Sequence, residues 1–105
     1  MKCVRKDVCS CWKINMDELT KLEKDSKSII NYRWVAQLIR FRRFSYIQIP
    51  DKDEVIFQAQ TSNGKYSIGY EGDYLVLYAL GDVQIYSESL FHAMFDIVEE
   101  DSVEI

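Results

Sequence analysis

A basic and aromatic segment carries the side chains best suited to binding. Its members are Arg33, Arg40, Phe41, Arg42, Arg43, Phe44 and Tyr46. Arginines that contact phosphate, with rings that stack on bases, are typical of single-stranded nucleic-acid binding. Arginine and tyrosine are also enriched at the centres of protein interfaces. A third interpretation places the rings in the core and leaves the arginines in solvent or paired with the acidic half of the chain.

The cysteines do not predict a metal site. Cys3, Cys9 and Cys11 have the spacing C-x5-C-x-C. A structural zinc site takes four ligands, usually beginning with C-x2-C or C-x4-C. A catalytic cysteine would need a histidine within hydrogen-bond reach. We therefore expect no metal, no cofactor and no catalytic residue.

The other candidates for acid–base chemistry have simpler interpretations. His92 is the single histidine, and on a C-terminal helix it points away from the apolar stripe, so we expect it in solvent. Glu71 and Asp73 flank Gly72 in a predicted turn, where carboxylates usually bond nearby backbone N–H groups. The chain is therefore predicted not to be an enzyme.

Charge is divided unevenly along the chain. Residues 1–43 hold eleven Lys and Arg against five Asp and Glu, a balance of +6. Residues 44–105 hold two against twelve, a balance of −10, and the two sum to the net charge of −4. Such asymmetry can mark a surface for a charged partner. It also allows the two halves to neutralise each other when they fold together. The overall acidity counts against nucleic acid.

Length and composition predict one domain over residues 1–105. The chain has no run of about 18 apolar residues that could span a bilayer. Its first 13 residues lack the apolar core of a signal peptide. We therefore expect a cytoplasmic protein without a membrane partner, of undetermined oligomeric state. Residues 1–13 are predicted to form a loose arm, and residues 100–105 a frayed acidic tail.

Two helices are predicted in the basic half. Asn15 and Glu18 form a capping pair, and Ile14 and Leu19 occupy the positions of a hydrophobic staple. Residues 32–43 fit a helix or a strand, and we favour a helix that ends near Phe41. A short strand should follow over residues 44–49, since Pro50 ends it.

Two hairpins and a final helix are predicted in the acidic half. Asn63-Gly64 suits a two-residue type I′ turn, which would pair Thr61 with Tyr66, Ala59 with Ile68 and Phe57 with Tyr70. Gly81-Asp82 would likewise pair Leu80 with Val83 and Tyr78 with Ile85. Ser87 should cap the helix, whose predicted core-facing stripe is Leu90, Phe91, Met94, Phe95 and Val98.

The segment 71–95 resembles a known pattern. Gly72-Asp73-Tyr74, Gly81-Asp82-Val83, Phe91 and Phe95 are similar to the turns and aromatic pair of the PGDYG-motif proteins, a group of small bacterial and phage proteins. Glu71 replaces the proline of that motif, Leu75 its last glycine, and Tyr78 stands where many members have glycine. The resemblance implies a fold fragment and a phage or prophage origin, without an activity.

We therefore predict an α+β fold. A small antiparallel sheet of four to five strands should pack against a C-terminal helix and one or two N-terminal helices. The predicted function is non-enzymatic binding of a host or cognate protein through a charged surface. Its candidate residues are Arg33, Arg40, Arg42, Arg43, Phe44 and Tyr46. The alternative is a nucleic-acid-binding accessory factor that uses the segment from Arg40 to Tyr46.

Overall fold

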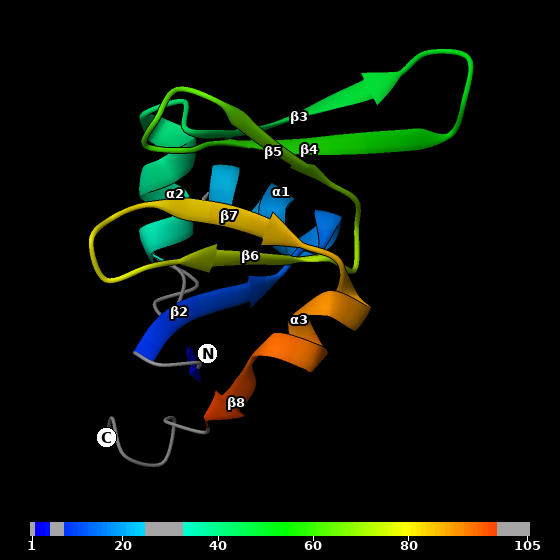
Figure 1. Cartoon of the computed structure of the whole chain (residues 1–105). Helices are drawn as coiled ribbons and strands as arrows, with labels where there is room; N and C mark the ends of the chain where they lie inside the picture. Colours follow the sequence, from blue (N-terminus) through cyan, green and yellow to red (C-terminus); the bar gives the residue numbers. More distant parts are fainter. Residues whose placement is uncertain (1, 5–7, 25–32, 99–105) are drawn as a thin grey trace.

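The computed structural model of this chain describes residues 2–4, 8–24 and 33–98 (Figure 1). The helices of this part are α1 (Met16–Lys24), α2 (Arg33–Arg40) and α3 (Glu88–Met94). Its strands are β1 (Lys2–Val4), β2 (Val8–Lys13), β3 (Phe44–Ile49), β4 (Glu54–Gln60), β5 (Tyr66–Gly69), β6 (Tyr74–Leu77), β7 (Val83–Tyr86) and β8 (Asp96–Val98). The chain is therefore an α+β protein, as predicted. The predicted acidic tail at 100–105 lies outside the described residues.

The described strands form two antiparallel sheets, whereas a single sheet was predicted. One has five strands in the order β7-β6-β2-β1-β8, and the other has three in the order β3-β4-β5. The chain enters the larger sheet at its N-terminus, leaves after β2 for the helices and the smaller sheet, and returns with β6. The prediction placed all strands after residue 43 in a single sheet and did not include β1 and β2, which belong to the larger sheet.

The predicted loose arm at residues 1–13 is wrong, because residues 2–4 and 8–13 form the paired strands β1 and β2. Residues 8–13 form β2, which pairs with both β1 and β6 at the centre of the larger sheet. Cys9, Cys11 and Trp12 are all buried. This strand lacks the alternating apolar pattern of a half-exposed strand because both of its faces are covered.

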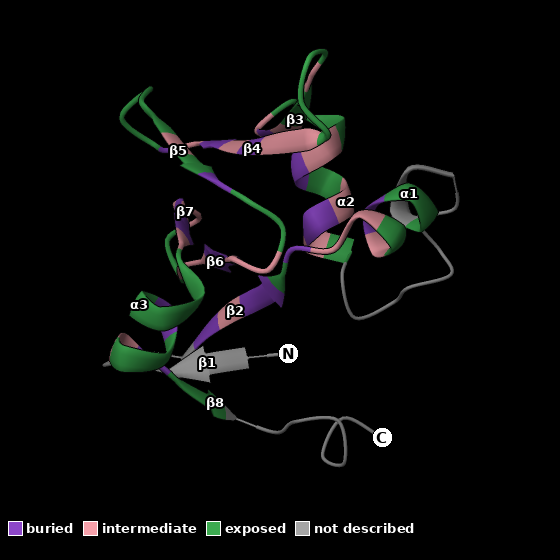
Figure 2. Cartoon of the chain, turned by 90° about the vertical axis from the view of Figure 1, so that its right-hand side faces the viewer, coloured by how far each residue is buried: buried purple, intermediate pink, exposed green. Residues whose placement is uncertain are grey.

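The larger sheet is a middle layer between two cores (Figure 2). On one face, Cys11 and Val76 lie opposite each other and pack with Phe91 of α3. On the other face, Trp12 and Leu75 lie opposite each other and pack against α1, α2 and the smaller sheet. Aromatic rings contact one another in both cores. The Tyr74 and Phe91 rings stack at 3.9 Å, and Trp12 meets Phe44 edge-on at 6.0 Å.

Both predicted N-terminal helices form. The N–H of Glu18 donates to Oδ1 of Asn15 at 3.0 Å, which confirms the cap of α1. Ile14 and Leu19 are both buried, as expected for a hydrophobic staple. Residues 33–40 are helical, so the ambiguity over 32–43 resolves to α2.

The C-terminal helix is shorter than predicted. Ser87 caps α3 as expected, since its side chain accepts the N–H of Leu90 at 3.3 Å. The helix ends at Met94, and residues 96–98 turn into β8, which pairs with β1. Phe91 and Phe95 are buried, but Leu90 is 47% exposed, so its place in the predicted stripe is wrong.

The Asn63-Gly64 hairpin forms with a longer turn than predicted. The N–H of Thr61 donates to the C=O of Lys65 at 2.8 Å, and the N–H of Gly64 donates to the C=O of Thr61 at 3.0 Å. Gly64 has φ of +84°, whereas Asn63 is not in the left-handed region that a type I′ turn requires. Oδ1 of Asn63 instead accepts the N–H of Lys65 at 3.3 Å. The loop therefore has three residues, with glycine last.

The second hairpin repeats this turn. The N–H of Tyr78 donates to the C=O of Asp82 and the N–H of Gly81 to the C=O of Tyr78, both at 2.9 Å. Gly81 has φ of +92°. Val83 consequently pairs with Leu77, and the predicted pairing with Leu80 is wrong.

The longer first turn shifts the β4–β5 pairing by one residue. Phe57 lies opposite Gly69 and Ala59 opposite Ser67, so the predicted pairing of Phe57 with Tyr70 is wrong. Small residues of β5 therefore face the core. A Cβ built on Gly69 would lie 2.3 Å from Cγ2 of Ile85, which shows how closely β5 approaches β7. The large side chains Tyr66 and Ile68 point outward and are exposed.

Candidate functional site

The structure divides the six predicted binding residues into two groups. The exposed or partly exposed group is Arg33, Arg40, Arg42 and Tyr46. The other two point inward, since Arg43 is partly buried and Phe44 is 1% exposed. Only part of the predicted surface therefore remains available to a partner.

Arg43 links the two sheets by a hydrogen bond. Its Nη2 donates to the C=O of Gly81, in the β6–β7 turn, at 3.0 Å. Asp82 strengthens the same junction, because its Oδ1 accepts the N–H of Ser62 at 2.8 Å and that of Val83 at 2.9 Å. Since its guanidinium is engaged within the molecule, we assign Arg43 to the fold.

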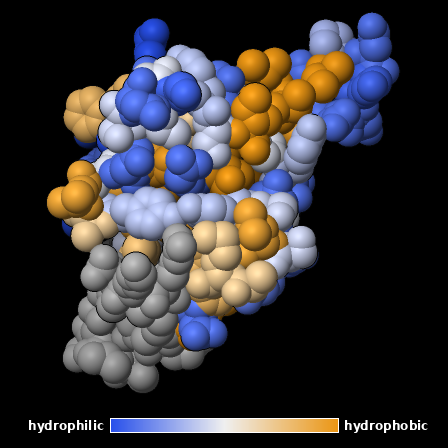
Figure 3. Space-filling model, in the orientation of Figure 1, coloured by the Kyte–Doolittle hydropathy of each residue, from blue (hydrophilic) through white to orange (hydrophobic). Residues whose placement is uncertain are grey.

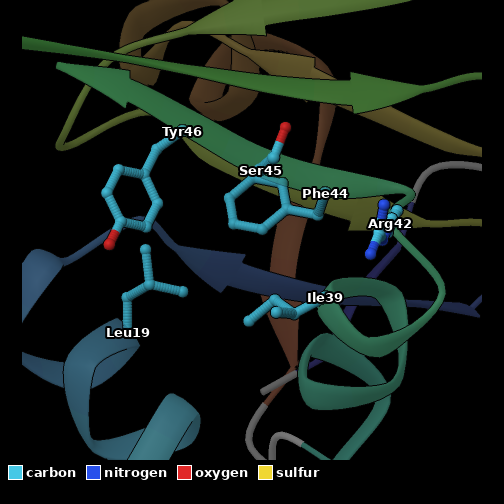
Figure 4. A pocket seen from close by; sticks show the side chains of 6 residues that line it. All are labelled: Leu19, Ile39, Arg42, Phe44, Ser45 and Tyr46. Carbon is cyan, nitrogen blue, oxygen red and sulfur yellow. The ribbon is translucent and has the colours of Figure 1, made fainter.

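A groove of about 310 Å³ lies between β3 and the two N-terminal helices. Its lining residues are Leu19, Ile39, Arg42, Phe44, Ser45 and Tyr46. Figure 4 shows Phe44 and Tyr46 pointing from β3 toward the helices, Leu19 and Ile39 rising from α1 and α2, and Arg42 at one end. The groove thus combines an apolar floor with a cationic end and a tyrosine hydroxyl at the other end.

Arg42 adopts an unusual backbone conformation at the rim of this groove. The N–H of Arg43 donates to the C=O of Leu38 at 2.8 Å, and the N–H of Arg42 donates to the C=O of Ile39 at 3.0 Å. These two bonds form a Schellman motif at the end of α2. Arg42 occupies its left-handed position at φ of +60°, which glycine usually takes. Among the described residues it is the single non-glycine with positive φ.

No carboxylate in the described part of the acidic half neutralises Arg40 or Arg42. Within residues 8–24 and 33–97, neither Arg40 nor Arg42 has a carboxylate close enough for an ion pair. Both side chains are exposed, at the end of α2 and immediately after it. Phe41, between them, is 70% exposed. The cationic end of the groove is therefore open to solvent.

The predicted turn carboxylates serve the backbone, as expected. Oδ2 of Asp73 accepts the N–H of Tyr70 at 2.9 Å. Oε2 of Glu71 accepts the N–H of Met16, the first residue of α1, at 3.1 Å. The turn therefore ties the start of α1 to the link between the sheets. Neither carboxylate belongs to an acid–base pair.

His92 is exposed, as predicted, and its ring lies edge-on to Tyr74 and Phe91 at 5.4 Å each. Nearby, Nζ of Lys13 and Oε2 of Glu88 lie 2.9 Å apart. The hydrogen bond and charge of this exposed pair raise the pKa of Lys13 and lower that of Glu88. Burial raises the pKa of Tyr74. None of these groups lines the groove beside β3, so we do not assign them to the candidate site.

Metal ligands do not gather in the part of the chain that the structure describes. No group of three or more His, Cys, Asp or Glu there could hold a metal ion. Cys9 and Cys11 are buried in the core beneath α3. The side chain of Cys3 lies outside the described residues.

A second hollow, of about 480 Å³, lies beside the β6–β7 turn. Cys9, Gln84 and the hydrogen-bonded hydroxyls of Tyr78 and Tyr86 line it. Its one charged residue is Asp82, whose carboxylate is already held by two backbone N–H groups. This hollow therefore offers less chemistry than the groove beside β3.

Sequence reasoning missed the groove's helical wall. Leu19 and Ile39 appear in the sequence as ordinary core residues, and only the packing of α1 and α2 against β3 brings them to the groove. One signal was available. The segment Phe41-Arg42-Arg43-Phe44 joins a helix to a strand without a glycine or asparagine. Such a short connection requires a left-handed residue, and here that residue is an arginine.

Comparison with protein-family models, curated proteins and solved structures finds no match to this chain. The resemblance of residues 71–95 to the PGDYG-motif proteins therefore stays a prediction. No helix within the described ranges is long and apolar enough to cross a membrane.

Proposed function

We propose that this chain is a non-enzymatic binding protein that docks a host or cognate protein in the groove beside β3. The docking residues are Arg42, Tyr46 and Ile39, above a buried floor that includes Leu19. Arg40 is exposed at the end of α2 and does not line the groove. An apolar floor framed by arginine and tyrosine has the composition of an interface hot spot.

The main observation in support of this proposal is the left-handed backbone of Arg42. Such a conformation costs a non-glycine residue roughly 1–2 kcal/mol. Strained backbones of this kind cluster at functional sites. The Arg42 side chain forms no hydrogen bond or ion pair within the described residues that would explain why arginine stands there. Its guanidinium lies at the rim of the groove, where a partner would meet it.

The test begins with two displayed libraries, one of random linear peptides and one of a small helical domain with a randomised face. Ligands selected on the wild-type protein are then titrated calorimetrically against Arg42→Gly and Tyr46→Ala. We expect each variant to weaken binding about tenfold or more, since truncated hot-spot residues commonly cost 2 kcal/mol or more.

The matched control is Arg33→Ala, which removes the same charge from the other end of α2. It should change affinity less than about twofold, because Arg33 does not line the groove. Selected ligands that bind Arg42→Gly and Tyr46→Ala as tightly as the wild type would refute the docking site.

Nucleic acid is the second candidate, and exposed Phe41 favours it. This ring lies between two exposed arginines, an arrangement that could stack on a base while the arginines contact phosphate. Labelled single-stranded oligonucleotides, titrated at low and high salt, test it. Tight binding that falls steeply with salt and is lost in Phe41→Ala would support nucleic acid over a protein partner.

A further inference from the structure

The hydrogen-bonding pattern of β3 leaves one of its edges open. The N–H of Gln60 donates to the C=O of Arg43 at 2.8 Å, immediately before β3 begins. Bonded and non-bonded pairs alternate along an antiparallel ladder, so Ser45 and Ile47 are the β3 residues that bond to β4. The N–H and C=O groups of Tyr46 and Gln48 therefore point away from β4. Among the described strands, β3 pairs with β4 alone.

The edge of β7 shows how this molecule closes a comparable edge. By the same alternation, Ile85 directs its N–H and C=O away from β6. The hydroxyl of Ser67 accepts that N–H at 2.9 Å and donates to that C=O at 3.3 Å. No described side chain bonds to the corresponding groups of Tyr46 and Gln48.

The open edge of β3 runs along the groove. Phe44 and Tyr46 point toward the helices from the strand itself, and Leu19 and Ile39 form the opposite wall (Figure 4). A strand paired with β3 would direct alternate side chains into this apolar space. A sheet edge beside a helix is the arrangement that peptide-binding domains use when they add a strand.

The outer face of β3 offers further apolar contact. Ile47 is 53% exposed there and lies opposite Ile56 of β4. Figure 3 shows hydrophobic surface gathered over the β3–β4 hairpin. The other alternate side chains of an added strand would meet this surface.

Charge indicates the composition of the added strand. Arg42 stands at the beginning of β3 with Arg40 nearby, both exposed. Asp51, Lys52 and Asp53, also exposed, stand beyond the other end and together carry one net negative charge. An acidic side chain is therefore favoured beside Arg42 and disfavoured at the hairpin tip.

We propose, on the basis of the docking function above, that the partner contributes an extended segment that adds to β3 as a fourth strand. Apolar side chains of this segment fill the groove, and an acidic side chain lies against Arg42. Backbone bonds to Tyr46 and Gln48 supply affinity, and the groove supplies selectivity.

The experiment uses the tightest linear peptide selected on the full-length protein. The peptide is resynthesised with single backbone amides replaced by esters, which removes one N–H at a time and keeps every side chain. We expect losses of roughly threefold to tenfold at alternate positions and almost none between them. On the protein, hydrogen exchange of the Tyr46 and Gln48 amides should slow about tenfold in the complex, while Ser45 and Ile47 change little.

Variants at Gln48 provide a second measurement. Gln48→Pro removes an N–H that faces the open edge, whereas Gln48→Ala removes only the side chain. The first should weaken the peptide about tenfold and the second less than about twofold. The ester series does not depend on whether Gln48→Pro folds.

Three outcomes would overturn strand addition. Ester losses that do not alternate would mean that the peptide binds by its side chains, and the docking function would stand. Ligands found only among helical domains would likewise leave the docking function and exclude a strand. A dimer of this chain that Gln48→Pro dissociates in sedimentation would make the occupant a second copy.

Discussion

The central strands β2 and β6 of the five-stranded sheet are covered on both faces, whereas the three-stranded sheet is covered on one. Three of the four residues of β6 are buried, since α3 lies on one side and the smaller sheet on the other (Figure 2). In β3, by contrast, Tyr46, Ile47 and Gln48 are exposed in succession. The edges differ in the same way: Ser67 closes the edge of β7, whereas no strand or side chain among the described residues pairs with the outer edge of β3.

This contrast assigns different tasks to the two sheets. Open apolar faces and open edges are liabilities that proteins usually cover. In this fold the hydroxyl of Ser67 satisfies the outward N–H and C=O groups of β7, whereas no described side chain does this for β3. Under the docking function proposed above, the larger sheet supplies stability and the smaller sheet presents the surface for the partner.

The largest expected effect lies in the core of the larger sheet. Phe91→Ala should lower the free energy of unfolding by about 3–5 kcal/mol, because the ring is fully buried and stacks on Tyr74 and Phe95. His92→Ala, one residue further along α3, should cost less than about 0.5 kcal/mol. Urea denaturation of both variants measures this. Equal losses would contradict the burial of α3 on this sheet.

The second prediction concerns the close approach of the two sheets. Gly69→Ala should cost about 1–3 kcal/mol, because its Cβ would collide with Cγ2 of Ile85. The same change made in an Ile85→Ala background should cost less than about 1 kcal/mol, since the colliding atom is gone. A double-mutant cycle in urea measures the coupling. Additive losses would mean that the two strands do not meet at this point.

The third prediction compares two serines on the smaller sheet. Ser67→Ala should cost about 1–2 kcal/mol, because it leaves the N–H and C=O of Ile85 without their partner. Ser45→Ala should cost less than about 0.5 kcal/mol, since its hydroxyl only accepts a bond from Gln58 on the open face. Thermal unfolding of the pair measures the difference. Equal effects would remove the distinction between a closed edge and an open one.

Local signals in the sequence predicted much of the fold. The caps at Asn15 and Ser87, the strand ended by Pro50 and the positions of both glycine turns were correct. Each relies on residues near one another in the chain, so one sequence suffices.

The errors arose where distant contacts decide the outcome. The turn lengths are an exception, because the bonds of the three-residue loops are local, from the N–H of Lys65 to the side chain of Asn63 and from the N–H of Tyr78 to the C=O of Asp82. The strand β2 depends on partners more than sixty residues away, such as Val76. The groove combines one short segment with two helices packed against it. Arg42 and Tyr46 belong to the segment and could be named from the sequence, but Leu19 and Ile39 could not.

The smallest expected effect on stability has the opposite sign and isolates the strain at the groove. Arg42→Gly should raise the free energy of unfolding by about 0.5–1 kcal/mol. Glycine relieves the left-handed conformation, which costs an arginine roughly 1–2 kcal/mol, and loses roughly 0.5–1 kcal/mol to its freer unfolded chain. Arg42→Ala keeps the strained backbone and removes the guanidinium, so it should leave stability nearly unchanged. Urea denaturation and ligand titration of both variants separate the two roles. Both should lose the selected ligand equally, although only the glycine variant gains stability. A glycine variant that unfolds more easily than the wild type would instead show that the Arg42 side chain supports the fold. Arg42 would then no longer distinguish the binding sheet from the stabilising sheet.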